Sequence, residues 1–426
     1  MTTAGSSVGE MGAMTRIADV LGRLDGTREW REELYARLHA HPELSSHEVE
    51  TAAEVSRRLE SFGYEVQRIG GGVVGVLVNG SGRGVLTRAD MDALPVTELT
   101  GLPYASKVTA VDESGATVGV SHACGHDVHV VALLGAAELL AGARDAWSGT
   151  FTALFQPAEE TAAGARAMLE DGLTDRVPRP DVAFGQHVLN HAAGLVGTQA
   201  GPVLSAGDSI RITVFGKGSH GSMPHLGVDP VVLAASIVLR LQTIVSRETK
   251  PGEFAVVTVG SSTAGTKSNI IADRAVLLVN VRTYDLEVRD RVLGSIERIV
   301  RAECEASGSP EAPTFEYYDQ YPLTDNDPDV TDRLTDAFRA HFGEGRVVTL
   351  GRVTASEDFS RLPDAFGIPY SYWGVGGFEP GQQRYPNHSP YFAPAIQPTL
   401  DAGTEAIVVA ALAYLGKDPN EGTPIG

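Results

Sequence analysis

Short hydrophobic runs alternate with amphipathic stretches over roughly the first 200 residues of the chain. The runs are bounded by turn-forming residues, which is typical of buried strands, and the stretches between them repeat apolar residues at helical spacing. We expect strands at residues 72–80, 84–90, 149–157 and 180–188, and helices at residues 129–143 and 163–172. This alternation indicates an α/β domain with a mostly parallel sheet and helices on both faces.

Two amphipathic helices are expected ahead of the first strand. Helical periodicity runs from about residue 17 to residue 44, and a second helical pattern covers residues 47–63. Ser45 and Glu48 stand just before and at the start of this second pattern, at the spacing of a capping box. We therefore predict that these two side chains bond the backbone N–H groups at the start of the helix.

The pattern changes near residue 203. A strand, a helix, two strands, a helix and a strand are expected at residues 208–218, 229–248, 253–262, 274–285, 287–308 and 314–322. This is the element order of a ferredoxin-like α+β unit. The α/β pattern then resumes, so we expect one α/β domain, residues 15–202 and 319–426, interrupted by a smaller domain at residues 203–318.

Composition narrows the class of partners. The chain has 426 residues, 42% of them hydrophobic, and a net charge of −20, which argues against nucleic acid because phosphates need a basic surface. No window approaches ~18 uninterrupted apolar residues and no secretion signal is visible, so we expect no membrane span and no export. Cys124 and Cys304 are the only cysteines, which favours the cytoplasm.

Ionisable side chains follow several of the expected strands. Because ligands gather at the carboxyl ends of the strands in an open α/β sheet, residues far apart in sequence can meet there. Cys124 and His126 lie on a loop that opens a helix, with Gly125 between them giving the backbone freedom to turn both side chains to one point. The candidates at strand ends are Asp90, Asp92, Glu159, Glu160 and His187.

Thiolate, imidazole and carboxylate groups together suit a divalent cation such as Zn, Co, Ni or Mn. A single histidine or cysteine is more often an ordinary buried side chain. Several charged groups gathered at one sheet edge, however, would repel one another without a cation. A thiol nucleophile, with Cys124 as the nucleophile and His126 as its base, is a second interpretation. A non-catalytic binding protein for metal or acyl-amino acids is a third.

Seven motifs give the chain a specific resemblance. It is similar to the metal-dependent amidohydrolases of the aminoacylase/carboxypeptidase family, in the branch of hippurate hydrolases, auxin-conjugate hydrolases and N-acyl-amino-acid amidohydrolases. Within that branch it most resembles actinobacterial N-acyl-glutamine aminoacylases. The motifs, in the family's order, are "RADMDALP", "HACGHDVH", "FQPAEE", "GQHV", "GSHGSMPH", "SEDFS" and "NHSP".

The resemblance implies a site with two divalent metal ions, Zn, Mn or Co. Cys124 would take the place of a bridging aspartate found in other branches. Glu159 matches the general base, and Asp92 matches an aspartate that orients the site from behind. The implied metal ligands are Cys124, His126, Glu160, His187 and His388.

The resemblance also makes the inserted domain a lid and dimerisation domain of a homodimer. His220 would reach the active site of the other subunit, and Asn269 and Arg282 would contact the substrate. His122, His129 and His225 are interpreted as supporting residues, and the histidines near residues 39–47 as structural.

These observations predict a metal-dependent hydrolase of small-molecule N-acyl-amino acids, which releases a carboxylic acid and a free amino acid. A metal activates water, and Glu159 moves the water's proton to the leaving nitrogen. A dipeptidase or carboxypeptidase with the same metal centre is the nearest alternative.

Overall fold

The computed structural model describes residues 16–112 and 115–415, and these divide into two compact units. The first unit comprises residues 16–201, 325–351 and 358–415 of the described part. The second comprises residues 202–324 and 352–357. It contains the predicted insertion at residues 203–318 and adds a second, short segment of chain.

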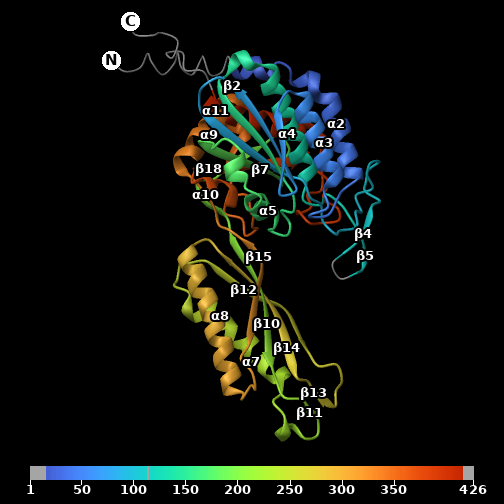
Figure 1. Ribbon diagram of the computed structural model, residues 1–426, viewed down its shortest axis with the longest axis vertical. Helices are drawn as coiled ribbons and strands as arrows, with labels where there is room; N and C mark the ends of the chain where they lie inside the picture. The colour runs from blue at the N-terminus through green and yellow to red at the C-terminus, as the bar shows by residue number, and fades with distance from the viewer. Residues whose placement is uncertain (1–15, 113–114, 416–426) are drawn as a thin grey trace, which may run out of the picture. The chain divides into compact units, whose positions relative to one another are not determined.

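The first unit is built on an eight-stranded sheet (Figure 1). Four neighbouring strands, β6, β3, β7 and β18, run parallel, and antiparallel strands complete the sheet on either side. The predicted fold class, a mostly parallel sheet interrupted by a smaller α+β domain, is therefore confirmed. The order is β1 (Glu65–Ile69), β2 (Gly72–Asn79), β6 (Gly149–Gln156), β3 (Gly84–Asp90), β7 (Val182–Ala192), β18 (Tyr370–Phe378), β8 (Val196–Thr198) and β17 (Val347–Thr349).

Helices cover both faces of this sheet. Alternate side chains of a strand point to opposite faces, and in β18 Trp373 packs on Phe338 while Tyr372 packs on Phe359 beside the opposite helices. The helices on the Trp373 side include α4 (His126–Gly142), α9 (Pro328–Phe342) and α11 (Ile396–Leu415), with α2 (Leu24–Ala40) and α3 (Val49–Ser61) against them. On the other side lie α5 (Gly164–Glu170) and α10 (Arg361–Phe366), with α6 (Leu173–Arg176) next to α5.

A buried ion pair joins α2 to α11 on the helical face. The Arg31 guanidinium is fully buried and donates to Asp401 at 2.7 Å, to Thr27 at 2.9 Å and to Thr404 at 3.3 Å. Gly135 of α4 makes room for it, because a Cβ there would lie 2.7 Å from Arg31 Cδ. The three helices are thus held together by one satisfied buried charge.

The predicted capping box at Ser45 and Glu48 is wrong. The first backbone N–H groups of α3, those of Glu50 and Thr51, donate instead to the carboxylate of Glu43, at 3.0 and 2.8 Å. Ser45 donates to Asp92, and Glu48 accepts from the N–H groups of Ser46 and Ala158. Both side chains turn away from the helix and toward the site described below.

The second unit has the predicted strand–helix–strand–strand–helix–strand order. Its four-stranded antiparallel sheet has the spatial order β12-β14-β10-β15, and the two long helices α7 and α8 pack on it (Figure 1). The elements are β10 (Ala206–Phe215), α7 (Pro230–Thr243), β12 (Ala255–Ala264), β14 (Arg274–Thr283), α8 (Leu286–Ala306) and β15 (Thr314–Tyr321). A short ribbon of β11 (Ser219–His220) and β13 (Ile270–Ile271) extends from it.

The remaining elements are short. They are β4 (Thr109–Val111), β5 (Thr117–Gly119), β9 (Gly201–Leu204), β16 (Thr324–Asn326) and the single turns η1 (Arg144–Ala146), η2 (Pro224–Leu226), η3 (Ile244–Glu248) and η4 (Glu344–Arg346). By length and composition alone, two helical stretches could cross a membrane, Pro230–Glu248 and Ile396–Leu415. The second of these is α11, which packs inside the first unit and is 78% buried, as expected for a core helix.

We predict that Asp401→Ala lowers the free energy of unfolding by about 3–5 kcal/mol, because it leaves the buried Arg31 charge without its partner. Urea denaturation followed by circular dichroism measures this change. Arg28→Ala is the matched control, since Arg28 contacts the same carboxylate at 2.6 Å from an exposed position and its loss should have a much smaller effect. Equal losses in the two variants would contradict the assignment.

Candidate metal centre

The candidate residues of the first unit meet at the carboxyl ends of its parallel strands. β3 ends at Asp90 and is followed by Asp92, while β6 ends just before the segment that carries Glu159 and Glu160. α4 begins at His126, directly after the loop with Cys124. That loop requires glycine at position 125, where φ is 83° and a Cβ would lie 2.4 Å from a side-chain carbon of Val188.

Five of the predicted residues form two groups that share one sulfur atom. One group contains Cys124, His126 and His187, the other Cys124, Glu160 and His388, and within each group the possible ligand atoms lie within 4.8 Å of one another. Cys124 Sγ is 3.4 Å from His187 Nε2, and Glu160 Oε2 is 3.4 Å from His388 Nε2. His126 Nε2 is 3.8 Å from Glu160 Oε1, so the two groups are contiguous.

Backbone carbonyls fix the ring nitrogens of two of these histidines. His126 Nδ1 lies 2.9 Å from the carbonyl oxygen of Asp92, and His187 Nδ1 lies 2.8 Å from that of Val188. Because a carbonyl only accepts, Nδ1 is the donor in both rings. Nε2, the nitrogen that faces the cluster, is then left to bind a ligand.

Two buried atoms of the cluster indicate that a cation fits there. His126 Nε2 and Glu160 Oε1 have no hydrogen-bond partner among the described residues, although both are buried. Buried polar atoms without partners are costly and rare in native proteins. A divalent cation between the imidazole, the thiol and the carboxylate would satisfy these atoms, and the donor set suits such an ion.

Asp92 lies beside the cluster and bonds His126. Its carboxylate accepts from His126 Nδ1 at 3.1 Å, from Ser45 Oγ at 2.7 Å and from the backbone N–H of Glu160 at 3.0 Å. Burial alone would raise the pKa of Asp92, but these donors outweigh it and lower the pKa. A carboxylate that orients a histidine ligand in this way is a common feature of metal sites.

The charges of the cluster favour a cation. Burial alone would lower the pKa of His126, but Asp90, Cys124 and Asp92 raise it well above its usual range. Hydrogen bonds to Cys124 and Glu160 raise the pKa of His388 to about 10. The anionic groups that hold protons on these rings would equally hold a metal ion.

His129 and Asp90 form a contact that the sequence analysis missed. His129 Nε2 accepts the N–H of Val188 at 2.8 Å, so Nδ1 carries the proton and donates to Asp90 at 2.5 Å. Asp90 also accepts from Arg88 at 2.6 Å. Both nitrogens of His129 are therefore in use, and it supports the strand next to His187 rather than binding an ion. The three-residue spacing from His126 on one helix was the only signal for it.

The other supporting histidines of the first unit lie around this cluster. His39 donates from Nδ1 to Asp127 at 2.7 Å and from Nε2 to Glu98 at 3.1 Å, in line with a structural role. His122 is buried and neither of its ring nitrogens has a hydrogen-bond partner among the described residues, while burial lowers its pKa to about 4.

The remaining predicted residues belong to the second unit. His220 is exposed on β11, where Nδ1 accepts the N–H of Ser222 at 3.2 Å and leaves Nε2 as the donor. Asn269 is exposed just before β13. Arg282, in β14, donates to Asn280 at 2.9 Å and to Ser356, and burial lowers its pKa. His225 is exposed in η2.

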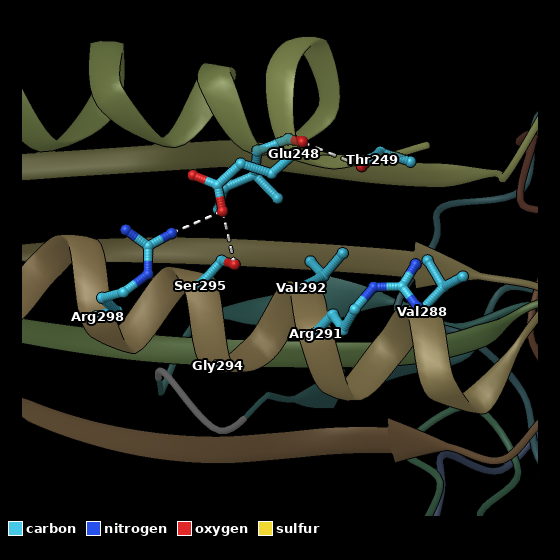
Figure 2. Close-up of a pocket in the computed structure, with 9 residues that line it drawn as sticks. Glu248, Thr249, Val288, Arg291, Val292, Gly294, Ser295 and Arg298 are labelled. Atoms are coloured by element: carbon cyan, nitrogen blue, oxygen red, sulfur yellow. Dashed lines mark hydrogen bonds and ion pairs between the residues drawn. The ribbon is translucent and has the colours of Figure 1, made fainter. Parts of the chain in front are cut away.

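A pocket of about 240 Å³ in the second unit lies between η3 and α8 (Figure 2). Its charged side chains are paired: Glu248 accepts from Arg298 at 2.6 Å and from Ser295 at 2.9 Å, and Arg291 pairs with Glu253, which lies outside the pocket lining. The walls of this pocket are therefore hydrophobic side chains and charged side chains that already have partners of opposite charge, unlike the side chains of the cluster at the sheet edge.

The sequence matches a family model described as "Peptidase family M20/M25/M40" over residues 86–413. An N-acetyl-L-cysteine deacetylase of Bacillus subtilis (strain 168) is 37% identical over 344 residues, which cover 80% of this chain and 79% of that protein. A hippurate hydrolase of Campylobacter jejuni is 37% identical over 346 residues, covering 80% of this chain and 87% of that one.

A solved structure has the same fold. The Bacillus subtilis YXEP protein, described as a dinuclear metal binding peptidase from the M20 family, superimposes with a TM-score of 0.74 at 30% identity. The superposition covers 92% of this chain and 99% of that one.

We predict that Co²⁺ added to the metal-free protein produces a sulfur-to-cobalt charge-transfer absorption band. Burial and Glu160 raise the pKa of the Cys124 thiol, so binding should also release its proton to the buffer. The band should vanish in Cys124→Ser. It should remain in Cys304→Ser, which changes the other buried cysteine. A band that persists in Cys124→Ser would contradict a thiolate ligand.

Proposed function

The chain belongs to the peptidase family M20/M25/M40, and we propose that it is the amide hydrolase of that family that splits N-acyl-amino acids into a carboxylic acid and a free amino acid. The observation that carries this proposal is the buried cluster at the sheet edge, where a shared thiol joins two groups of possible metal ligands and a second glutamate stands beside them. The similarity to a deacetylase and a hippurate hydrolase supports the substrate class.

The proposed metal ligands are Cys124, His126, Glu160, His187 and His388. They would hold two divalent ions, of which Zn, Mn and Co are the candidates, and the Cys124 sulfur belongs to both groups of possible ligand atoms. When bound, the ions would lower the pKa of water and polarise the carbonyl oxygen of the amide. Asp92 would keep the His126 ring in the orientation that presents Nε2.

Glu159 is the proposed general base. It is buried, and its carboxylate lies 4.0 Å from His126 Nε2, at the rim of the ligand cluster. Glu160, the next residue, also faces His126, with Oε1 3.8 Å from His126 Nε2. Its other oxygen, Oε2, lies 3.4 Å from His388 Nε2 in the second group. Glu159 would take a proton from water as the amide carbonyl is attacked and then deliver it to the leaving nitrogen.

A thiol hydrolase is less well supported. A nucleophilic cysteine needs a lowered pKa, whereas burial and Glu160 raise the pKa of Cys124. That interpretation also leaves the carboxylate pair without a task. A binding protein would not need Glu159, and a dipeptidase or carboxypeptidase would use the same residues on a different acyl group.

The second unit would supply substrate contacts and the interface of a homodimer. We propose that His220 and Asn269 act on the substrate bound by the partner subunit and that Arg282 binds the substrate carboxylate. Dimer formation is supported by α7 and the turn η3 that follows it, which together expose four large apolar side chains, and by the edge position of β12. The four side chains are Val231, Val232 and Leu239 of α7 and Val245 of η3.

We further propose a cytoplasmic enzyme that acts on small molecules, with neither a nucleic acid nor a membrane as partner. The net charge of −20 and the two free, buried cysteines support this.

The activity test is a panel of N-acetyl-, N-benzoyl- and long-acyl-amino acids, including acyl-glutamines, together with dipeptides. The protein is assayed after loading with Zn, Mn or Co. We expect hydrolysis of acyl-amino acids that a chelator abolishes and added metal restores. Glu159→Gln should lower kcat by about 10²–10⁴-fold with its metal content unchanged, because only proton transfer is lost.

Glu170→Gln, an exposed change on the same stretch of chain, is the control and should behave as wild type. Activity that survives metal removal would contradict the metal mechanism. Hydrolysis of dipeptides alone would support the peptidase alternative instead.

The dimer test is Leu239→Glu, which places a charge on the outer face of α7, where Leu239 is 74% exposed. We expect a dimer for the wild type and a monomer for the variant by light scattering. The variant should lose kcat but keep its metal. Val78→Glu alters an apolar residue of similar exposure in the first unit and should remain dimeric. A monomeric and fully active wild type would contradict the proposal.

A further inference from the structure

The turn that carries the two glutamates has an unusual backbone. Ala158, directly before Glu159, has a φ of 47°, and Ala162, two residues after Glu160, has a φ of 53°. Both lie in the left-handed region, which residues with a Cβ rarely adopt unless the surroundings fix them. The orientation of Glu159 therefore depends on whatever holds Ala158 in place.

Glu48 holds the N–H side of Ala158, whose carbonyl oxygen accepts the N–H groups of Ala163 and Gly164 within the turn. Its Oε1 accepts the N–H of Ala158 at 2.7 Å and the N–H of Ser46 at 3.1 Å. Glu48 is 5% exposed and lies 110 positions from Ala158 in sequence, so the bond is a buried tertiary contact and not a helix cap. A carboxylate bonded to backbone N–H groups is among the stronger hydrogen-bond arrangements in proteins.

Packing alone would restrain the backbone of Ala158 less well than packing together with the hydrogen bond to Glu48. The same backbone, with Glu48, Gly70, Gly71 and Pro157, lines a cavity of about 240 Å³ in the first unit. A segment that borders open space on one side loses contacts there and moves more easily. The hydrogen bond from the N–H of Ala158 to Glu48 Oε1 is therefore what restrains the backbone on the side of the turn that faces the cavity.

Ser45 completes the contact from the same loop. Its Oγ donates to Asp92 at 2.7 Å, and Asp92 accepts the N–H of Glu160 at 3.0 Å. The loop is itself anchored by Glu43, whose carboxylate takes the first N–H groups of α3 and whose carbonyl accepts from Ala93 at 2.8 Å. One anchored loop thus reaches the glutamate turn on both sides, through Ala158 and through Asp92.

We propose that Glu48 is a positioning residue, which sets the place of the Glu159 carboxylate by holding the backbone of Ala158. This inference rests on the proposed function, since it assigns Glu48 a part in the reaction of the same site. It predicts a loss of kcat without a loss of metal, because Glu48 bonds the backbone N–H groups of Ser46 and Ala158 and not the side chains of the proposed ligands.

A neutral isostere should serve in its place. Burial and, to a smaller extent, Asp92 raise the pKa of Glu48 to about 7, so a neutral acceptor in its place avoids the cost of a buried charge. Glutamine keeps a carbonyl oxygen at the same reach and can accept both N–H groups. Alanine removes the acceptor, and aspartate withdraws it by one methylene group.

The experiment compares Glu48→Ala, Glu48→Gln and Glu48→Asp with the wild type in the loaded enzyme. We expect kcat to fall at least 10-fold in the alanine and aspartate variants, with KM within about 3-fold of the wild type and the metal content unchanged. The glutamine variant should retain kcat within about 3-fold. Glu50→Ala, at an exposed position two residues away, is the control and should match the wild type.

Hydrogen exchange of the peptide that spans residues 157–164 gives a readout independent of turnover. It should quicken about 10-fold in the alanine variant and stay near the wild-type rate in the glutamine variant. Unchanged exchange, or an unchanged kcat in Glu48→Ala, would overturn the inference. A wild type that hydrolyses no member of the substrate panel would instead refute the proposed function, and the exchange rates would still decide whether Glu48 holds the turn. Should the alanine variant not fold, the aspartate variant gives the same decision.

Discussion

The candidate site depends on one buried carboxylate, that of Asp92. It receives hydrogen bonds from the loop before α3, from the first residue of α4 and from the segment after β6, so three distant parts of the chain meet on it. An ionised carboxylate that is 1% exposed is stable only when donors replace the water it has lost. The folding of the unit and the geometry of the site are therefore linked, since two of the three donors to Asp92, His126 and the N–H of Glu160, lie on the segments that carry the proposed ligands and base.

The neighbouring Asp90 follows the same rule with different partners. It accepts from His129 and Arg88, and Arg88 in turn donates to Gln156 at 3.0 Å and to Asp358 at 3.2 Å. The two buried carboxylates at the end of β3 thus have separate sets of donors. Asp92 is bonded by the glutamate turn, and Asp90 by groups that connect to the neighbouring strands of the sheet. This separation leaves the unpartnered atoms, His126 Nε2 and Glu160 Oε1, as the part of the polar network that still requires a positive charge.

The sequence predicted the elements and the gathering of residues better than it predicted their contacts. Hydrophobic periodicity located three of the four parallel strands, β3, β6 and β7, but not β18, and the rule for strand ends predicted that Asp92, Glu160 and His187 lie at one edge. The capping box failed because Ser45 and Glu48 satisfy that local pattern equally well whether they bond their own helix or a strand end far along the chain. Local spacing cannot distinguish these states, since the choice depends on Asp92 and Ala158, which only the folded sheet brings near. The pairing of His129 with Asp90 depended on tertiary register in the same way.

Proximity alone does not select the ligands either. His129 lies as close to the cluster as the ligand histidines do, with its ring centroid 4.6 Å from that of His187. Its Nε2 accepts a backbone N–H, however, while His126 and His187 each donate from Nδ1 to a backbone carbonyl. The hydrogen-bond partners of the two ring nitrogens thus decide which histidine has a free lone pair on Nε2 for an ion. Those partners are fixed by the backbone next to each ring, so the tautomers that make His126 and His187 the proposed ligands follow from the same packing of α4 against β7 that closes the core.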